Sequence, residues 1–348
     1  MACTPEGGHH RGMQQTSTMT RRIGALTVSG LGFGCWAIAG PFGREGAAAG
    51  WGDVDDDESV AAIRRALELG VTLFDTADVY GTGHSERVLA RALGRDRDGV
   101  AIATKFGNTF EDGTGRMTGT DASPAYIRSA LAASLRRLRS DRVELYQCHL
   151  GDLEPAQADE VAGTLEELRA EGLIGAYGWS LDDAERAAQW AGRDGCAAIQ
   201  HHLNVLEDAP EMVALCERHG LASIDRAPLA MGLLSGKFDA TSRLPRDDVR
   251  ASGASWLTAF DPEGRPRRDF LERLAAVREL LTGDGRTLVQ GALGWLWARS
   301  ERTVPIPGFK TVAQAEENAG ALAHGSLGAD VLREIEDVLG RPAPQPAA

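Results

Sequence analysis

Four ionisable residues follow apolar segments of the sequence at positions where they could act together. In "VTLFDTADVYGTGHSE", Asp75 ends an apolar run and Tyr80 comes five residues later, while "VAIATK" ends at Lys105 and "VELYQCHL" contains His149. The carboxyl ends of parallel barrel strands meet on one face, so these side chains are expected to converge. An ammonium near a phenol lowers the pKa of the phenol, and a carboxylate can orient that ammonium. The pattern predicts Tyr80 as a proton donor tuned by Lys105 and Asp75, with His149 orienting a substrate oxygen.

The elements that would position these residues repeat along the chain. Short apolar, β-branched segments alternate with longer amphipathic segments, which is typical of βα units around a parallel sheet. Eight units can be traced, with strands expected within 28–36, 71–77, 100–105, 143–150, 174–180, 197–203, 221–230 and 303–307. Helices are expected near 57–69, 85–93, 123–138, 156–171, 182–191, 210–219, 269–282 and 311–322.

This repeat predicts an α/β fold, a closed (β/α)8 TIM barrel. The alternative is an open doubly wound sheet, which normally places a glycine-rich turn directly before a helix. No helix is expected immediately after "GLGFG" at 30–34, so the barrel is favoured.

The barrel is expected to form a single domain over residues 21–340, with disordered tails at 1–20 and 341–348. A long polar loop at 237–268 follows the seventh strand, and extra C-terminal helices, one of them within 287–300, fall outside the repeat. Loops of this length are usually functional or disordered, and a lid over a cofactor or substrate is the preferred interpretation.

Composition narrows the class of protein. The net charge is −13, with acids spread along the chain, which argues against nucleic-acid and anionic-membrane partners. No apolar run approaches the roughly 20 residues that span a bilayer, and the first twenty residues lack the apolar core of a secretory signal. Five cysteines without paired spacing indicate reduced thiols and no zinc site. A cytoplasmic protein without a metal is expected, and its oligomeric state stays open.

The lysines are unusually few. Of the 37 basic residues, only Lys105, Lys237 and Lys310 are lysine, and the other 34 are arginine. Compositional bias explains most of this imbalance, but it raises the question of whether an amine is needed at these three positions.

The motifs together resemble those of the aldo-keto reductases, from about residue 22 to residue 340. The segments "GVTLFDTADVYGTGHSE", "AIATK" and "LYQCHL" are similar to that family's catalytic signatures. The resemblance implies that Tyr80 is the general acid, that Lys105 and Asp75 tune it, and that His149 positions a carbonyl. It also implies NADPH-dependent reduction of a small-molecule aldehyde or ketone, with all three lysines in catalytic or cofactor motifs.

The resemblance further implies a set of cofactor contacts. Ser180 in "GWS" and Gln200 would bind the nicotinamide carboxamide, whereas Leu181 replaces a residue that is often Asn or Arg in the family. Arg226 takes the place of an aromatic ring that stacks on the nicotinamide, and a planar guanidinium can also stack. The remaining implied contacts come from the rim, the pyrophosphate loop and the adenosine-phosphate segment, and they are Cys35, Trp36, Asp75, Pro228, Leu229, Ala230, Met231, Gly232, Lys237, Gly308, Lys310, Gln314, Glu317 and Asn318.

Lys310 is expected to favour NADP(H) over NAD(H) by meeting a 2′-phosphate. Trp36, Phe106, Tyr80 and His149 are the candidates for substrate contact, although Trp36 could equally be simple packing. Two alternatives to a reductase remain: an NADP(H)-binding redox sensor or regulatory subunit, as in channel-associated β subunits of the family, and an alcohol or sugar dehydrogenase working in the oxidative direction.

Overall fold

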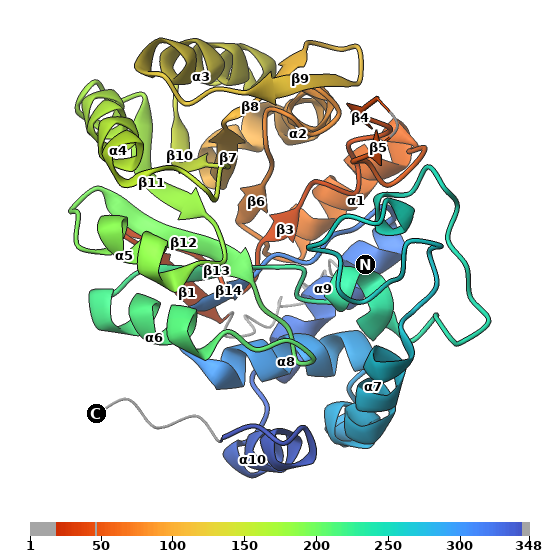
Figure 1. Cartoon of the computed structure of the whole chain (residues 1–348). Coiled ribbons are helices and arrows are strands. Elements are labelled where there is room, and N and C mark those ends of the chain that lie inside the picture. Colours follow the sequence, from red (N-terminus) through yellow and green to blue (C-terminus); the bar gives the residue numbers. More distant parts are fainter. Residues whose placement is uncertain (1–18, 46, 343–348) are drawn as a thin grey trace, which may run out of the picture.

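Eight parallel strands form the centre of the computed structural model, and helices surround them (Figure 1). The structure describes residues 19–45 and 47–342. The strands lie in the order β14-β13-β12-β11-β10-β7-β6-β3, and every neighbouring pair is parallel. Their bounds are β3 Phe33–Gly34, β6 Leu73–Asp75, β7 Ala101–Phe106, β10 Val143–Cys148, β11 Ile174–Ser180, β12 Cys196–His202, β13 Ala222–Arg226 and β14 Thr303–Pro305.

The helices follow the strands along the chain as the repeat predicts. Several begin at a side-chain cap: Asp55, Ser123 and Asp183 each accept hydrogen bonds from the first-turn backbone N–H groups that have no partner inside the helix. The helix bounds are α1 Asp56–Glu68, α2 His84–Leu93, α3 Pro124–Leu138, α4 Pro155–Ala170, α5 Ala184–Ala191, α6 Pro210–His219, α7 Arg268–Leu281, α8 Leu288–Arg299, α9 Val312–His324 and α10 Ala329–Val338.

Glycines close the sheet into a barrel between β3 and β14. The Gly32 N–H donates to Pro305 O at 2.9 Å, and the Gly34 N–H donates to Pro307 O at 3.1 Å. A Cβ atom on Gly34 would lie 2.8 Å from Ile306 O, closer than real Cβ contacts come. The close approach of the two backbones therefore requires glycine at position 34, and the predicted (β/α)8 barrel is confirmed.

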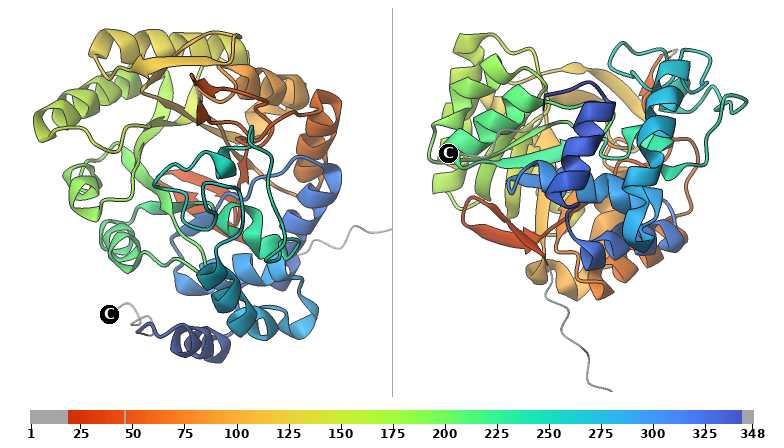
Figure 2. Two further views of the ribbon diagram at one scale, coloured as in Figure 1. Left: turned by 45° about the vertical axis from the view of Figure 1, so that its right-hand side comes forward. Right: turned by 90° about the horizontal axis from the view of Figure 1, so that it is seen from below.

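An antiparallel hairpin that the sequence analysis did not predict covers the amino-terminal end of the barrel. It consists of β1 (Thr20–Ile23) and β2 (Leu26–Ser29). Ile23 and Val28 are buried against Leu73 and Ala101, which lie at the starts of β6 and β7. In Figure 2 the hairpin, in red, lies on the opposite side of the molecule from the 237–268 loop.

A second unpredicted element lies on the carboxyl face. It is a four-stranded sheet in the order β5-β4-β9-β8, formed by the loops that follow β3 and β7. Phe42 and Val79 belong to a small buried apolar cluster, and Met117 and Tyr80 pack against it. The strands are β4 Gly43–Arg44, β5 Ala47–Ala48, β8 Asn108–Glu111 and β9 Arg116–Thr120.

The 237–268 loop is packed onto the carboxyl face. Its Val249 N–H donates to Gly50 O at 2.8 Å, and Trp51 pairs with Asp248 in an isolated antiparallel bridge. Leu257 and Phe260 are buried, which gives the loop apolar anchors of its own. The loop therefore lies across the loop that follows β3.

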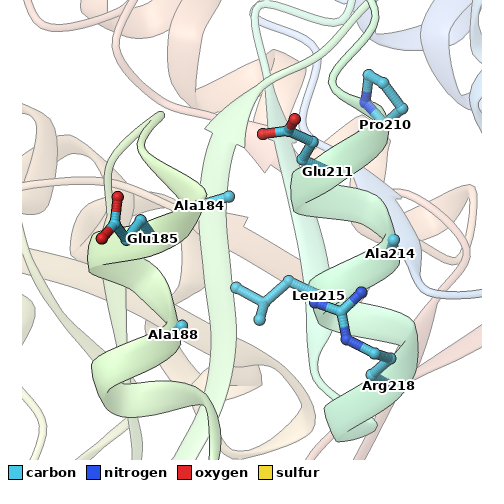
Figure 3. Close-up of a pocket in the computed structure, with 8 residues that line it drawn as sticks. All are labelled: Ala184, Glu185, Ala188, Pro210, Glu211, Ala214, Leu215 and Arg218. Carbon is cyan, nitrogen blue, oxygen red and sulfur yellow. The ribbon is translucent and has the colours of Figure 1, made fainter.

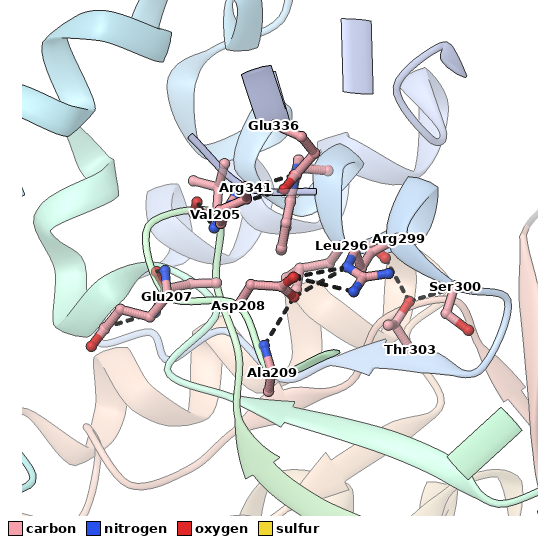
Figure 4. Close-up of polar contacts among 12 residues, drawn as sticks. Val205, Glu207, Asp208, Ala209, Leu296, Arg299, Ser300, Thr303, Glu336 and Arg341 are labelled. Atoms are coloured by element: carbon pink, nitrogen blue, oxygen red, sulfur yellow. Dashed lines mark hydrogen bonds and ion pairs between the residues drawn. The ribbon is translucent and has the colours of Figure 1, made fainter. Parts of the chain in front are cut away.

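The C-terminal end is held by buried charges. Arg341 pairs with Glu336 at 2.8 Å and donates to Val205 O at 3.0 Å, and Arg299 pairs with Asp208 at 3.1 Å (Figure 4). The ordered chain thus includes Arg341, and β1 begins at Thr20, although both residues were assigned to the tails. The rest of those tails, residues 1–18 and 343–348, lies outside the described residues. Within residues 19–45 and 47–342, no helix is both long and apolar enough to cross a membrane.

Candidate active site

A buried ion pair joins two neighbouring strands at the carboxyl end of the barrel. Lys105 Nζ lies 2.5 Å from Asp75 Oδ1 and also donates to Thr76 O at 2.7 Å. The Lys105 side chain is completely buried. Burial lowers the pKa of Lys105, but Asp75 and Tyr80 together raise it by a larger amount. The net pKa therefore lies above its usual value. Lys105 therefore carries a positive charge inside the barrel.

Two glutamines fix the other oxygen of Asp75. Gln200 Nε2 donates to Asp75 Oδ2 at 2.7 Å, and Gln147 Nε2 donates to the same oxygen at 3.2 Å. Both amides are buried, so these hydrogen bonds compensate the carboxylate for the water it has lost. Gln147 was missed in the sequence analysis, although it precedes His149 by two residues and thus faces the same side of its strand.

Tyr80 lies directly over this pair. Its ring centroid is 5.1 Å from Lys105 Nζ and 5.9 Å from the ring of His149. Burial raises the pKa of Tyr80 and Asp75 adds to the rise, while Lys105 opposes it; the net pKa is above its usual value. The expectation that Lys105 brings this pKa down toward neutrality is corrected here, because burial outweighs the ammonium. Tyr80 thus holds its proton at neutral pH.

His149 is uncharged at neutral pH. Burial, followed by the charges of Lys105 and Arg226, lowers the pKa of His149 to about 3. Its Nδ1 atom is buried and has no hydrogen-bond partner in the described parts of the chain. A neutral imidazole with a free ring nitrogen beside a phenol can bind a substrate oxygen.

Aromatic side chains form a wall beside Tyr80. Trp36 stacks on Tyr80 at 5.9 Å with an interplanar angle of 18°, and Trp256 from the long loop lies 5.9 Å from Trp36. The indole N–H of Trp36 donates to Ala49 O at 2.9 Å, which fixes the ring. Trp36 therefore stands next to the phenol, as a substrate contact requires.

Two predicted contacts are corrected. Phe106 is completely buried and packs against Tyr146 at 4.8 Å between the sheet and its helices, because it alternates with the inward-facing Lys105. Cys35 is also completely buried; its N–H donates to Asp75 O and its carbonyl accepts from Ser85 Oγ. Phe106 does not reach a substrate, and Cys35 has no side-chain or backbone donor left for a cofactor.

The expected nicotinamide contacts come from three adjacent strand ends. Ser180 ends β11, Gln200 lies in β12 and Arg226 ends β13. The Arg226 guanidinium forms an ion pair with Asp182, a residue that the sequence analysis did not select. Leu181 is buried, and its N–H donates to Gln200 O at 3.0 Å. The side chains of Ser180 and Gln200 are buried. The Arg226–Asp182 pair is therefore the polar group at these strand ends that is most open to solvent.

The segment after β13 has an unusual backbone. Ala227, Ala230 and Met231 have positive φ angles of 52°, 46° and 55°, and Gly232 has 92°. Successive residues near the left-handed region turn backbone N–H groups into a concave surface that suits anions. Within Pro228–Gly232, the N–H groups of Ala230 and Gly232 donate to Ala227 O and Leu229 O, each at 2.9 Å, so the role of this segment in phosphate binding stays a prediction.

Three cations gather beside this segment. Arg250 Nη1 donates to Met231 O at 3.1 Å, and Arg250 pairs with Asp248 at 2.6 Å. Partial burial lowers the pKa of Lys237 and of Lys310, and Arg250 lowers both further. The carboxylates of Asp248, Asp53 and Asp247 act on the pKa of Lys310 in the opposite direction, so the three cations lie among three acids. Arg250 was missed because it lies inside the polar loop.

Lys310 reaches across to the loop after β3. Its Nζ donates to Trp51 O at 2.6 Å and to Asp53 O at 3.2 Å. Gln314 Oε1 accepts from Lys310 N at 2.7 Å, and Asn318 Nδ2 donates to Gly308 O at 3.2 Å. Gln314 and Asn318 therefore shape the turn that presents Lys310, while Glu317 is partly exposed one position before Asn318 on the same helix.

Hollows elsewhere on the surface lack this chemistry. A groove between α5 and α6 is lined by Ala184, Glu185, Pro210, Leu215 and neighbours on the outer wall of the barrel (Figure 3). None of the residues that surround Tyr80 lines it. A second hollow lies on the four-stranded sheet beside Phe42 and Asp247.

The residues from 31 to 339 match the model of the aldo/keto reductase family. The chain belongs to the aldo/keto reductase family. An uncharacterised oxidoreductase, YqkF from Bacillus subtilis, is 31% identical over 91% of this chain and 95% of its own. The aldo-keto reductase yakc [NADP(+)] of Schizosaccharomyces pombe is 29% identical over 88% of this chain and 87% of its own. The glycerol dehydrogenase AKR11B4 from Gluconobacter oxydans has a similar structure, with a TM-score of 0.76 and 30% identity over 94% of this chain and 97% of its own.

Proposed function

We propose that this aldo/keto reductase uses NADPH to reduce an aldehyde or ketone to an alcohol, with Tyr80 as the proton donor. The observation that carries the proposal is the grouping of a protonated phenol, a buried ammonium and a neutral imidazole at the carboxyl ends of the neighbouring strands β6, β7 and β10. Bound NADPH would supply the hydride for the carbonyl carbon. A relative whose name specifies NADP(+) supports the choice of cofactor.

The residues of the chain divide the proton step among them. Tyr80 donates its proton to the oxygen that becomes the alcohol, and Lys105 stabilises the phenolate that remains. Asp75 holds Lys105 in place, and Gln147 and Gln200 hold Asp75. His149 offers the substrate oxygen a second hydrogen bond without adding charge.

We assign cofactor binding to the carboxyl face of the barrel, around the segment that follows β13. The backbone of Pro228–Gly232 and the cations Lys237 and Arg250 would meet the pyrophosphate, and Lys310 would meet the 2′-phosphate that distinguishes NADPH from NADH. Ser180 and Gln200 would orient the carboxamide, and Glu317 and Asn318 would face the adenine. Lys237, Arg250 and Lys310 supply three cations for a ligand with several phosphate charges, beside the carboxylates of Asp53, Asp247 and Asp248.

A second candidate is the same chemistry run as an alcohol oxidation. The similarity to a glycerol dehydrogenase favours it. In that direction, Tyr80 would accept the proton of the alcohol by microscopic reversibility.

The Tyr80→Phe variant tests the proton donor. Its kcat for carbonyl reduction should fall by about 100-fold or more, since general acid catalysis contributes on that order. The dissociation constant of NADPH, followed by tryptophan fluorescence, should change little, because the ring is kept. Trp36 stacks on Tyr80 and Trp256 lies beside Trp36, so these indoles can report on ligand binding. Full activity in the variant would remove Tyr80 from the mechanism.

A further inference from the structure

The long loop carries an exposed indole beside the candidate active site. Trp256 is one of two large hydrophobic side chains that are exposed within residues 19–45 and 47–342, and its exposed fraction is 44%. Its ring centroid lies 5.9 Å from that of Trp36, which in turn stacks on Tyr80 at 5.9 Å. Successive ring contacts therefore lead from the phenol to an aromatic surface that is open to solvent.

A hydrogen bond ties the segment around Trp256 to the loop that follows β12. Thr258 Oγ1 donates to Glu207 Oε1 at 2.5 Å, and His202 Nε2 lies 2.7 Å from Glu207 Oε2. Burial raises the pKa of Glu207, but His202, Thr258 and Asn204 lower it by a larger amount, to about 2. Glu207 is thus a carboxylate at neutral pH, and hydrogen bonds to a charged acceptor are stronger than those between neutral groups.

Glu207 is itself held in place. Asn204 and Glu207 exchange two backbone hydrogen bonds of 3.0 Å, and Asn204 Nδ2 donates to Glu207 Oε2 at 3.2 Å. Asn204 is completely buried, and its Oδ1 accepts the Leu206 N–H at 2.9 Å. Leu206 O accepts from Arg273 of α7 at 2.7 Å. The acceptor of the Thr258 hydroxyl is therefore a fixed point, two residues along the chain from Trp256.

The proposed proton donor decides where a substrate begins. The carbonyl oxygen is assigned to Tyr80 and His149, whose ring centroids are 5.9 Å apart. The rest of the substrate has to extend past Trp36, whose ring is fixed by its hydrogen bond to Ala49 O. Trp256 is the next ring outward, and aromatic rings attract one another at centroid separations of about 4.5–7 Å. A flat substrate that extends beyond Trp36 can gain this second contact.

We infer that Trp256 determines specificity for carbonyl substrates with an extended aromatic group, and that Glu207 positions this indole through the hydroxyl of Thr258. The inference rests on the proposed function. An aromatic pair in contact changes an affinity by about twofold to tenfold. Loss of the Thr258 hydrogen bond should weaken the contact with the outer part of the substrate and leave the reaction at the carbonyl unaffected.

The test compares two aldehydes with the same reacting group. Benzaldehyde has one ring, and 4-phenylbenzaldehyde has a second ring that extends away from the carbonyl. We would measure kcat/KM with NADPH for both aldehydes in the wild type, Trp256→Ala, Thr258→Val, Thr258→Ser and the double variant Trp256→Ala/Thr258→Val. The control is Thr241→Val, an exposed threonine of the same loop whose hydroxyl donates to Asp239 at 2.7 Å.

The quantity of interest is kcat/KM for 4-phenylbenzaldehyde divided by kcat/KM for benzaldehyde. This ratio should fall by about twofold to tenfold in Trp256→Ala and in Thr258→Val. It should stay at the wild-type value in Thr258→Ser, which keeps the hydroxyl, and in the control. The double variant should match Trp256→Ala, because the hydrogen bond acts through the indole alone. The kcat/KM for benzaldehyde should be unchanged throughout, which shows that each variant is folded.

Three results would overturn the inference and leave the proposed function intact. The first is a wild type that reduces benzaldehyde but not the longer aldehyde, and the second is an unchanged ratio in Trp256→Ala. The third is a further fall of the ratio when Thr258→Val is added to Trp256→Ala. The exposed Trp256→Ala variant tests the indole by itself if Thr258→Val does not fold. A wild type that reduces neither aldehyde contradicts the proposed function as well.

Discussion

At the scale of single residues, the candidate active site depends on a lysine whose charge is stabilised by protein groups instead of water. Lys105 is fully buried, and it keeps its charge because Asp75 and Thr76 O accept its hydrogen bonds. Breaking such a pair from one side leaves an uncompensated buried charge. The two glutamines on Asp75 extend the same principle, since they satisfy the oxygen that Lys105 does not reach.

The raised pKa of Tyr80 predicts different pH profiles for the two directions of reaction. Reduction needs the protonated phenol, so its kcat/KM should be flat between about pH 6 and 9. Alcohol oxidation needs the phenolate, whose population rises about tenfold per pH unit below the pKa, so its kcat/KM should climb steadily over that range. Steady-state rates on a matched carbonyl and alcohol pair check this. A plateau of the oxidation rate near neutral pH would show that Lys105 outweighs burial after all.

The lowered pKa of His149 predicts a loss of stability in acid. The folded pKa of about 3 lies below the unfolded value of about 6.5. The unfolded state therefore binds more protons in this window, so the contribution is full above about pH 6.5 and is lost as the pH falls toward 3. The expected loss at pH 5 is about 2 kcal/mol.

Urea unfolding at pH 7 and pH 5 measures this loss. His149→Asn should reduce the difference between the two free energies of unfolding, whereas the exposed His219→Asn should leave it as in the wild type. Equal pH dependence in all three proteins would contradict the assignment.

At the scale of elements, the site depends on how strands and loops meet. The eight strands bring Asp75, Lys105 and Gln200 together inside the barrel, and the 237–268 loop brings Arg250 to Met231 in the segment that we propose binds phosphate. Strand order was predictable because the βα repeat is regular. The hairpin at the amino end and the sheet on the rim were not, because their strands are only two to five residues long and lack a clear alternation.

The contact between β3 and β14, where the barrel closes, gives a prediction at this scale. Gly34→Ala should lower the free energy of unfolding by about 1–3 kcal/mol, since the new methyl group would press on the carbonyl oxygen of Ile306, directly after β14. Gly163→Ala is the matched control: it lies in α4 with open space around its Cβ position. That substitution should be neutral or stabilising by about 0.5–1 kcal/mol, because alanine favours helix. The free energies of unfolding of both variants, measured by chemical unfolding, decide whether the backbones at Gly34 and Ile306 approach as closely as the structure shows.

At the scale of the whole molecule, binding of a ligand that crosses the carboxyl face should tie together distant parts of the chain. Lys310 contacts the loop after β3, and that loop contacts the 237–268 segment through Val249 and Asp248. Residues from the first, seventh and eighth βα units thus share one surface. The free energy of binding at this surface adds to the stability of the complete fold.

NADPH at about 100 times its Kd should therefore stabilise the protein by about 2.7 kcal/mol and raise its Tm. Lys310→Ala should shrink the Tm shift caused by NADPH and leave the shift caused by NADH unchanged, because only NADPH carries the 2′-phosphate. Arg268→Ala, which removes a 91% exposed cation from α7, is the control. Equal shifts with the two cofactors in the wild type would contradict the preference assigned to Lys310.

The sequence by itself determined the barrel and the family and gave the candidate catalytic residues, because apolar periodicity and strand-end residues are local properties that a parallel sheet turns into one site. Only the tertiary structure decided which way each side chain faces and what it meets. It buried Phe106 and Cys35, revealed Gln147, Asp182 and Arg250, and raised the pKa of Tyr80 where a lowered one was expected. The physical reason is that burial and long-range pairing depend on residues distant in sequence, and a local pattern does not contain them.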